Sequence, residues 1–112
     1  MDEVFGKTYV EHVAKLFKIL GDANRLRILL TIGKGERSVS QIIEATSLSQ
    51  TLASFHLRAL RDAGIVAAGR QGAFIYYRLA NADLLDLISE FQDCTNKERA
   101  ETKKLEFPCP CP

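Results

Sequence analysis

Three cysteines near one end of this 112-residue chain are the side chains with the most distinctive chemistry. Cys94 is followed by the pair Cys109 and Cys111, which a single proline separates. Thiolates are soft ligands, and three sulfurs suit a thiophilic ion such as arsenite or antimonite. The prolines stiffen the pair and lower the entropy that is lost when it becomes ordered. The cysteines therefore predict a metalloid site formed by Cys94, Cys109 and Cys111.

Other uses of the same thiols stay open. Zinc or cadmium is one, but zinc prefers four ligands, so His12 or His56 would have to add a nitrogen. A redox or persulfide switch is another, in which Cys94 forms a disulfide with one tail cysteine, because a bond within the Cys-Pro-Cys pair would be strained. A third is that the tail is disordered and its cysteines have no role.

A thiol enzyme is not expected. Such an enzyme needs an activated cysteine, typically in a C-x-x-C motif at the start of a helix, and the chain has no such motif. A catalytic Ser/His/Asp set and a glycine-rich phosphate loop are absent from the sequence as well. The chain is therefore predicted to bind ligands rather than to catalyse a reaction.

A second group of side chains lies on the helix predicted from Ser49 to Ala63. Its outer face carries amide, hydroxyl and guanidinium groups: Gln50, Thr51, Ser54, Arg58 and Arg61. A helix in the major groove of DNA needs short donors and acceptors near its N-terminus and arginines for bases or phosphates. On the inner face, His56 is interpreted as a half-buried packing residue beside Leu57 and Leu60. Phe55 either contacts a thymine methyl group or packs on the flank of the helix.

Charge is unevenly distributed along the chain. The net charge is only +1, but residues 49–78 hold four arginines and one aspartate, which is a local net charge of +3. Arg70 and Gln71 lie in the segment Gly69–Gly72, whose composition predicts the turn of a hairpin. We therefore expect Arg70 and Gln71 to contact DNA together with the polar helix face.

The elements that position these residues follow from the spacing of apolar side chains. Helices are predicted over residues 3–20, 23–32, 41–46 and 49–63, then a hairpin with strands 65–68 and 74–79, and a last helix capped by Asn81. The third and fourth helices have the outline of a helix-turn-helix. The predicted fold is mainly α with one β-hairpin, in the order α-α-α-α-β-β-α. Residues 1–95 form the predicted domain, and residues 96–112 form a tail.

Composition places the chain among globular proteins, with 46% apolar and 26% charged residues. No apolar run approaches the ~18 residues of a membrane-spanning helix. The first residues lack the apolar core of a signal peptide. We therefore expect a cytoplasmic protein with no membrane partner.

Three segments of the sequence are together specific for one family. They read LGDANRLRILLTI, VSQIIEATSLSQTLASFHLRALRDAGIV and RQGAFIYYRL. The chain resembles the ArsR/SmtB family of bacterial winged helix-turn-helix repressors from about Leu16 to Leu79. The resemblance implies a homodimer formed through the first and last helices, an operator with inverted-repeat symmetry, and DNA contacts at Gln50, Thr51, Ser54 and Phe55.

The resemblance also implies that an inducer releases the operator DNA. Two inducer sites used in the family are not expected here, because the segment ERSVSQII has no cysteine and the last helix has no histidine. The cysteines Cys94, Cys109 and Cys111 remain. The prediction is a repressor that needs no cofactor to bind DNA and is released by As(III) or Sb(III), with zinc, cadmium or thiol oxidation as alternatives.

Overall fold

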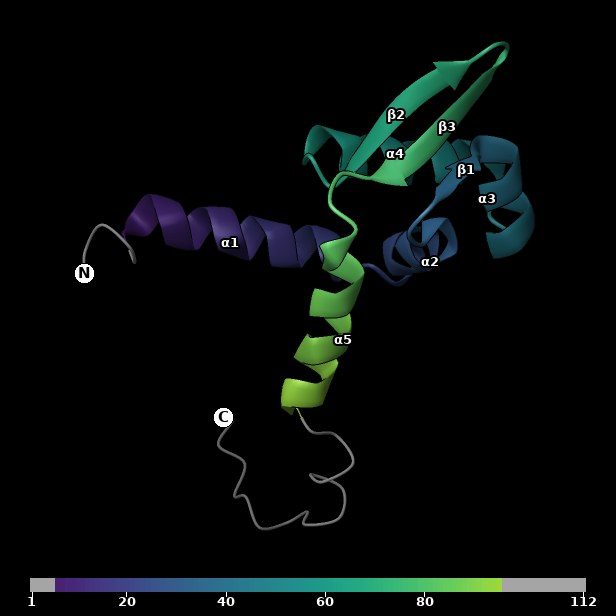
Figure 1. Ribbon diagram of the computed structural model, residues 1–112. Helices are drawn as coiled ribbons and strands as arrows, with labels where there is room; N and C mark the ends of the chain where they lie inside the picture. Colours follow the sequence, from purple (N-terminus) through teal and green to yellow (C-terminus); the bar gives the residue numbers. More distant parts are fainter. Residues whose placement is uncertain (1–5, 96–112) are drawn as a thin grey trace. The chain divides into compact units, whose positions relative to one another are not determined.

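The computed structural model describes residues 6–95 of the chain (Figure 1). Within them the elements follow in the order α1 (Lys7–Leu20), α2 (Ala23–Ile32), β1 (Glu36–Ser38), α3 (Val39–Thr46), α4 (Gln50–Asp62), β2 (Val66–Gln71), β3 (Phe74–Leu79) and α5 (Asp83–Thr95). Two compact units are present, the first ending at Ala82 and the second beginning with α5. This order confirms the predicted winged helix-turn-helix fold, to which the structure adds the short strand β1.

The core of the first unit lies between α2, α3 and α4, and the base of the sheet closes it. Its buried apolar side chains are Ile28, Leu29, Ile32, Ile42, Ala53, Leu57, Leu60, Val66 and Leu79. Full burial of a leucine or isoleucine side chain stabilises a fold by about 1.5–3 kcal/mol relative to exposure. Because Leu57 and Leu60 are held in this core, the opposite side of α4 faces outward.

Local capping signals fix the bounds of α2 and α4. Asp22 accepts hydrogen bonds from two backbone N–H groups in the first turn of α2, at 2.8 and 3.2 Å. The Ser49 hydroxyl accepts one from the backbone N–H of Leu52, at 3.1 Å. Gly64, with a φ of 78°, follows the end of α4. These caps confirm the predicted positions of both helices.

Helix α3 begins two residues earlier than the sequence predicts. Its cap is Ser38, whose hydroxyl accepts from the backbone N–H of Gln41 at 3.2 Å. The Gln41 side chain accepts in return from the backbone N–H of Ser38 at 2.8 Å. This reciprocal pair satisfies two donors at once, so the helix already includes residues 39 and 40. The left-handed Ser47, with a φ of 62°, ends α3 and makes the tight break before α4.

The bounds of the outer helices also differ from the prediction. Gly6 has extended backbone and precedes α1, which begins at Lys7 rather than at residue 3. Helix α5 begins at Asp83, so Asn81 does not stand directly before it. The predicted tail, residues 96–112, lies outside the described residues. None of the described helices is long and apolar enough to span a membrane.

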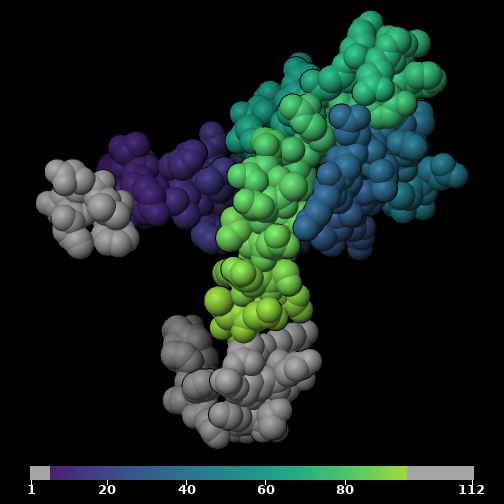
Figure 2. Space-filling model, in the orientation of Figure 1, coloured from purple at the N-terminus to yellow at the C-terminus, as the bar shows by residue number. Residues whose placement is uncertain are grey.

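The hairpin, which we call the wing, has its turn later in the chain than predicted. Strands β2 and β3 are antiparallel, with Gln71 opposite Phe74, so the turn is formed by Gly72 and Ala73 rather than by residues 69–72. Gly72 has a φ of 65°, a conformation that suits a two-residue hairpin turn. β1 pairs with the other side of β3, giving the sheet order β1-β3-β2. The tip of the β2–β3 hairpin extends beyond the helices α2–α4 (Figures 1 and 2).

Helices α1 and α5 differ from the three core helices because neither has a buried residue. On α1 the exposed fractions are 49% for Tyr9, 51% for Val10 and 57% for Phe17. On α5, Leu87 and Phe91 are each 58% exposed. Both helices therefore present large apolar side chains to the solvent.

Candidate nucleic-acid interface

The two sides of α4 have different surroundings. Its buried side chains are Ala53, His56, Leu57 and Leu60, the inner face that the sequence predicts. His56 is 5% exposed, so it is more deeply buried than the half-buried residue expected. The predicted contact residues on the other side, Gln50, Thr51, Ser54, Phe55, Arg58 and Arg61, are all exposed. The helix thus holds its polar side outward on a fixed apolar base.

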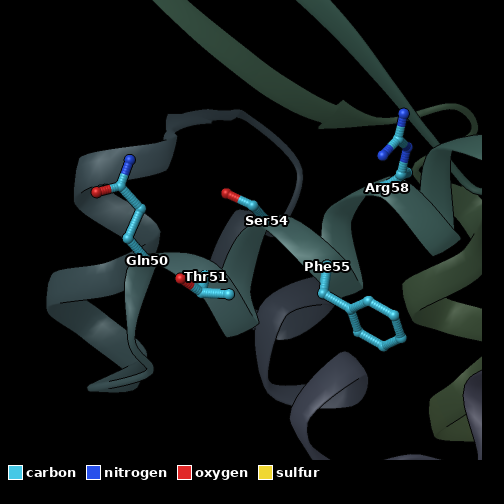
Figure 3. A pocket seen from close by; sticks show the side chains of 5 residues that line it. All are labelled: Gln50, Thr51, Ser54, Phe55 and Arg58. Carbon is cyan, nitrogen blue, oxygen red and sulfur yellow. The ribbon is translucent and has the colours of Figure 1, made fainter.

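Five of the exposed side chains line one open hollow on the outer side of α4. They are Gln50, Thr51, Ser54, Phe55 and Arg58. Figure 3 shows Gln50, Ser54 and Arg58 pointing to one side along the helix, with Thr51 and Phe55 along the neighbouring edge. Amide, hydroxyl, guanidinium and aromatic groups are therefore available together. These groups can hydrogen-bond base edges, contact a thymine methyl group and neutralise a phosphate.

A second hollow continues from the first towards the wing. Gln50 and Ser54 line both hollows, and the second is completed by the start of α3 and by strand β3 with the residue before it: Ser38, Val39, Ser40, Ala73, Phe74, Ile75 and Tyr77. Phe74 is 58% exposed and Ile75 is 40% exposed. Sequence reasoning assigned these two residues only to a strand. The signal that could have identified them is two large apolar residues next to the polar turn of the hairpin.

The remaining predicted contacts lie beyond the hollow on α4. Arg61 is exposed in the last turn of α4, and Arg70 is exposed on β2, opposite Ile75. Gln71 is exposed too, but its side-chain amide donates to the Glu36 carboxylate at 3.3 Å. Arg61, Arg70 and Gln71 therefore do not join the five side chains of the α4 hollow.

A polar network lies beneath this surface, at the start of α2. The Arg25 Nε–H donates to His56 Nδ1 at 3.2 Å, and the Arg25 Nη1–H donates to the carbonyl oxygen of Ile19 at 3.3 Å. The Asp22 carboxylate lies 4.0 Å from His56 Nε2. The pKa of Asp22 is lowered, chiefly by the hydrogen bond from the backbone N–H of Arg25. No sequence pattern indicated that residues 31 positions apart would pair.

The predicted metalloid site is only partly within the described residues. Cys94 is an exposed free thiol on α5. Cys109 and Cys111 lie outside the described residues. His12, the nitrogen ligand of the zinc alternative, is exposed on α1. Among residues 6–95 no group of three or more histidine, cysteine or acidic side chains could hold a metal ion.

Comparison with known proteins identifies relatives over most of the chain. Residues 22–68, from the cap of α2 into β2, match the family described as bacterial regulatory protein, arsR family. The transcriptional repressor SmtB homolog of Synechocystis sp. is 31% identical over 91 residues, which are 81% of this chain and 69% of the relative. The arsenic resistance transcriptional regulator ArsR1 of Pseudomonas putida is 45% identical over 65 residues, 57% of this chain and 51% of the relative.

A solved structure agrees with the fold. It is the solution structure of Mb0332 from Mycobacterium bovis, described as a homodimeric winged helix-turn-helix DNA-binding domain of a possible ArsR-family transcriptional regulator. Its TM-score is 0.72 at 35% identity, over 84% of this chain and 87% of the other. The chain spans about half the length of several curated relatives, 41% in one and 51% in the P. putida protein. These relatives are transcriptional regulators and not enzymes.

Proposed function

Because the chain belongs to the ArsR/SmtB family of winged helix-turn-helix transcriptional regulators, we propose that it represses transcription by binding operator DNA as a homodimer. Membership confirms the resemblance that the three sequence segments indicated. The observation that supports DNA binding most strongly is the outer side of α4. There, five polar and aromatic side chains line one hollow while the inner side is fixed in the core.

In this proposal α4 lies in the major groove. Gln50, Thr51 and Ser54, in its first turns, hydrogen-bond base edges, because amide and hydroxyl groups there can reach donors and acceptors on the bases. Phe55 contacts a thymine methyl group, since its ring is 59% exposed beside them. Arg58 pairs with a phosphate or a guanine at the far end of the hollow.

The wing then contacts the neighbouring part of the duplex. Arg70 is exposed on the wing and enters the adjacent minor groove, whose negative potential attracts arginine. Gln71 adds a contact there once its amide leaves Glu36. Arg61, one turn beyond the hollow, contacts a phosphate. The DNA strand between the two grooves then crosses the second hollow, which Gln50 and Ser54 share with the wing.

A second copy of the chain covers the exposed apolar sides of α1 and α5. Tyr9, Val10 and Phe17 on α1 and Leu87 and Phe91 on α5 supply the apolar area that such an interface needs. Two-fold symmetry of the dimer matches an inverted repeat, with half-site centres about one helical turn apart. We propose a cytoplasmic location for this activity, because operator DNA lies in the bacterial cytoplasm.

The test is a gel shift with a duplex from the region upstream of this chain's own gene. We expect binding that outcompetes a scrambled duplex of the same length and composition, and that weakens steeply as salt increases. Equal binding to both duplexes would contradict a sequence-specific repressor. Binding of neither would indicate a winged-helix module with a protein partner.

For the inducer, we propose As(III) or Sb(III) held by Cys94, Cys109 and Cys111. Two observations support this choice. The Cys94 thiol is exposed at the end of α5, and three thiolates match the soft, three-coordinate preference of arsenite. A relative in P. putida is named for arsenic resistance. Binding at the end of α5 would alter the apolar side that α5 contributes to the dimer, with a coupling of about 1–3 kcal/mol to DNA binding.

The inducer is tested by adding arsenite, antimonite, zinc, cadmium or polysulfide to the protein–DNA complex. We expect arsenite and antimonite to release the wild type, and Cys94→Ser, Cys109→Ser and Cys111→Ser each to stay bound. His12→Asn is the matched control: it keeps the arsenite response but would lose a zinc response that used the His12 nitrogen. Release of the triple serine variant by arsenite would place the site elsewhere. Release by polysulfide alone would indicate a redox switch.

A further inference from the structure

A buried imidazole touches the surface that we propose for DNA. His56 is 5% exposed on the inner side of α4. Its ring meets the ring of Phe55 edge to face, with centroids 5.4 Å apart and an interplanar angle of 68°. Phe55 is 59% exposed and lines the α4 hollow. The buried imidazole is therefore in direct contact with a side chain on the outer surface.

One guanidinium group holds this imidazole. The Arg25 Nε–H donates to His56 Nδ1 at 3.2 Å, while its Nη1–H donates to the carbonyl oxygen of Ile19 at 3.3 Å. Ile19 lies in the last turn of α1, and Arg25 lies in the first turn of α2. Arg25 thus joins the end of α1 to the inner side of α4. A change at either end alters the support beneath Phe55.

The bond between Arg25 and His56 exists in only one protonation state of the ring. Nδ1 must be free of hydrogen to accept from Arg25, so the neutral ring carries its hydrogen on Nε2. That nitrogen lies 4.0 Å from the Asp22 carboxylate. A second proton would place an N–H group opposite the N–H of Arg25 and would make the ring a cation beside Asp22. Protonation of His56 would therefore replace its hydrogen bond with Arg25 by an ion pair with Asp22.

Within residues 6–95, two charged side chains contact the His56 ring. Its charged neighbours, Arg25 and Asp22, both come from the start of α2. The other elements that pack on α4 are α3 and β2, whose buried apolar side chains are Ile42 and Val66. The pKa of Asp22 is lowered by the backbone N–H of Arg25 first and by that of Asn24 as well, so Asp22 stays ionised near neutral pH.

We propose that Arg25 and His56 are positioning residues for the DNA-reading side of α4, and that protonation of His56 weakens operator binding. The inference rests on the proposed function. Loss of the Arg25 bond moves the ring towards Asp22 and shifts Phe55 with it. Weaker binding on protonation would distinguish this positioning effect from a simple charge effect, because an added positive charge on its own strengthens binding to DNA.

The test measures affinity for a duplex from the region upstream of the gene at two pH values and constant salt. We expect the wild type to bind roughly three- to tenfold more weakly at about pH 5.5 than at about pH 8, which is the effect of losing about one hydrogen bond. His56→Asn keeps an acceptor near the position of Nδ1 but does not titrate. It should bind like the wild type at the higher pH and show no loss at the lower pH.

Two further variants separate positioning from other causes. His12→Asn changes the other histidine, which is exposed on α1, and should keep the pH profile of the wild type. His56→Leu removes the acceptor and should bind weakly at both pH values, while circular dichroism shows that it is folded. A wild-type profile in His56→Asn would overturn the proposal. Absence of DNA binding by the wild type at both pH values would overturn the proposed function, and this inference with it.

A measurement on the wild type keeps the proposal testable if the His56 variants do not fold. Nitrogen-15 shifts of the imidazole rings distinguish the two neutral tautomers. We expect His56 at about pH 8 to carry its hydrogen on Nε2, as its bond to Arg25 requires. A hydrogen on Nδ1 would exclude the Arg25 bond and overturn the proposal.

Discussion

Helices α4 and α5 both have 13 residues, but they differ in whether their apolar side chains are buried. Four side chains of α4 are buried, and none of α5 is. The apolar side of α4 packs in the core of the same chain, and its polar side is exposed. On α5, Leu87 and Phe91 themselves remain more than half exposed. The difference agrees with the two partners that we propose: DNA for α4 and a second copy of the chain for α5.

The largest effect is expected from a charge on the apolar side of α5. Leu87→Glu should give a monomer, because a buried carboxylate is costly in an apolar interface. A monomer loses the second half-site, so operator affinity should fall by about 10²- to 10⁴-fold. Sedimentation and gel shift measure both results. Gln92→Glu places the same charge elsewhere on α5 and should leave a dimer. A dimeric Leu87→Glu protein would contradict the role of this surface.

The next effect tests whether the outer side of α4 reads sequence. Gln50→Ala should reduce the preference for operator over scrambled DNA by about 1–3 kcal/mol, because one base contact is lost. Ser54→Ala should act in the same direction. Gln92→Ala, which removes a glutamine from α5, is the control. Equal losses on operator and scrambled DNA would show that these side chains do not contact bases.

A smaller and more uniform effect is expected at the far end of the hollow. Arg58→Ala should weaken binding to operator and scrambled DNA alike. If Arg58 contacts a phosphate, the salt dependence of binding should become shallower by about one unit of slope. Arg27→Ala removes an exposed arginine of α2 and is the matched control. An unchanged slope in Arg58→Ala would assign Arg58 to a base instead.

The smallest effect is expected from the N-terminal cap of α4. Ser49→Ala removes the hydroxyl that caps the helix at 3.1 Å. The free energy of unfolding should fall by about 1 kcal/mol, as measured by denaturant titration. Ser89→Ala on α5 should leave it nearly unchanged. A stable Ser49→Ala protein would mean that packing of the inner face alone defines where α4 begins.

Local signals explain which parts of the fold could be predicted from the sequence. Ser49 and Gly64 bound α4 by chemistry within a few residues, and the apolar spacing between them identified its inner face. Strand β1 has no such signal, because Glu36–Ser38 becomes a strand only by pairing with β3 about 40 residues later. The turn at Gly72 is likewise set by strand register, since Gly69 offered equal freedom.

The residues of the candidate site likewise include some that the sequence predicts and some that it does not. The exposure of Gln50, Ser54 and Arg58 follows from helical spacing alone. The bond between Arg25 and His56 joins residues that approach only after the core has formed, so the sequence placed His56 in the interior without its partner. The thiol site depends on residues beyond 95 and stays a prediction.

We propose above all that the outer side of α4 and the wing contact DNA. The most direct test is to follow backbone amide signals of the labelled protein while a duplex from the region upstream of its gene is added. The largest changes should fall in residues 50–58 and around Arg70, with smaller ones in α1 and α5. Changes confined to α1 or α5, with residues 50–58 and the wing unaffected, would contradict the account.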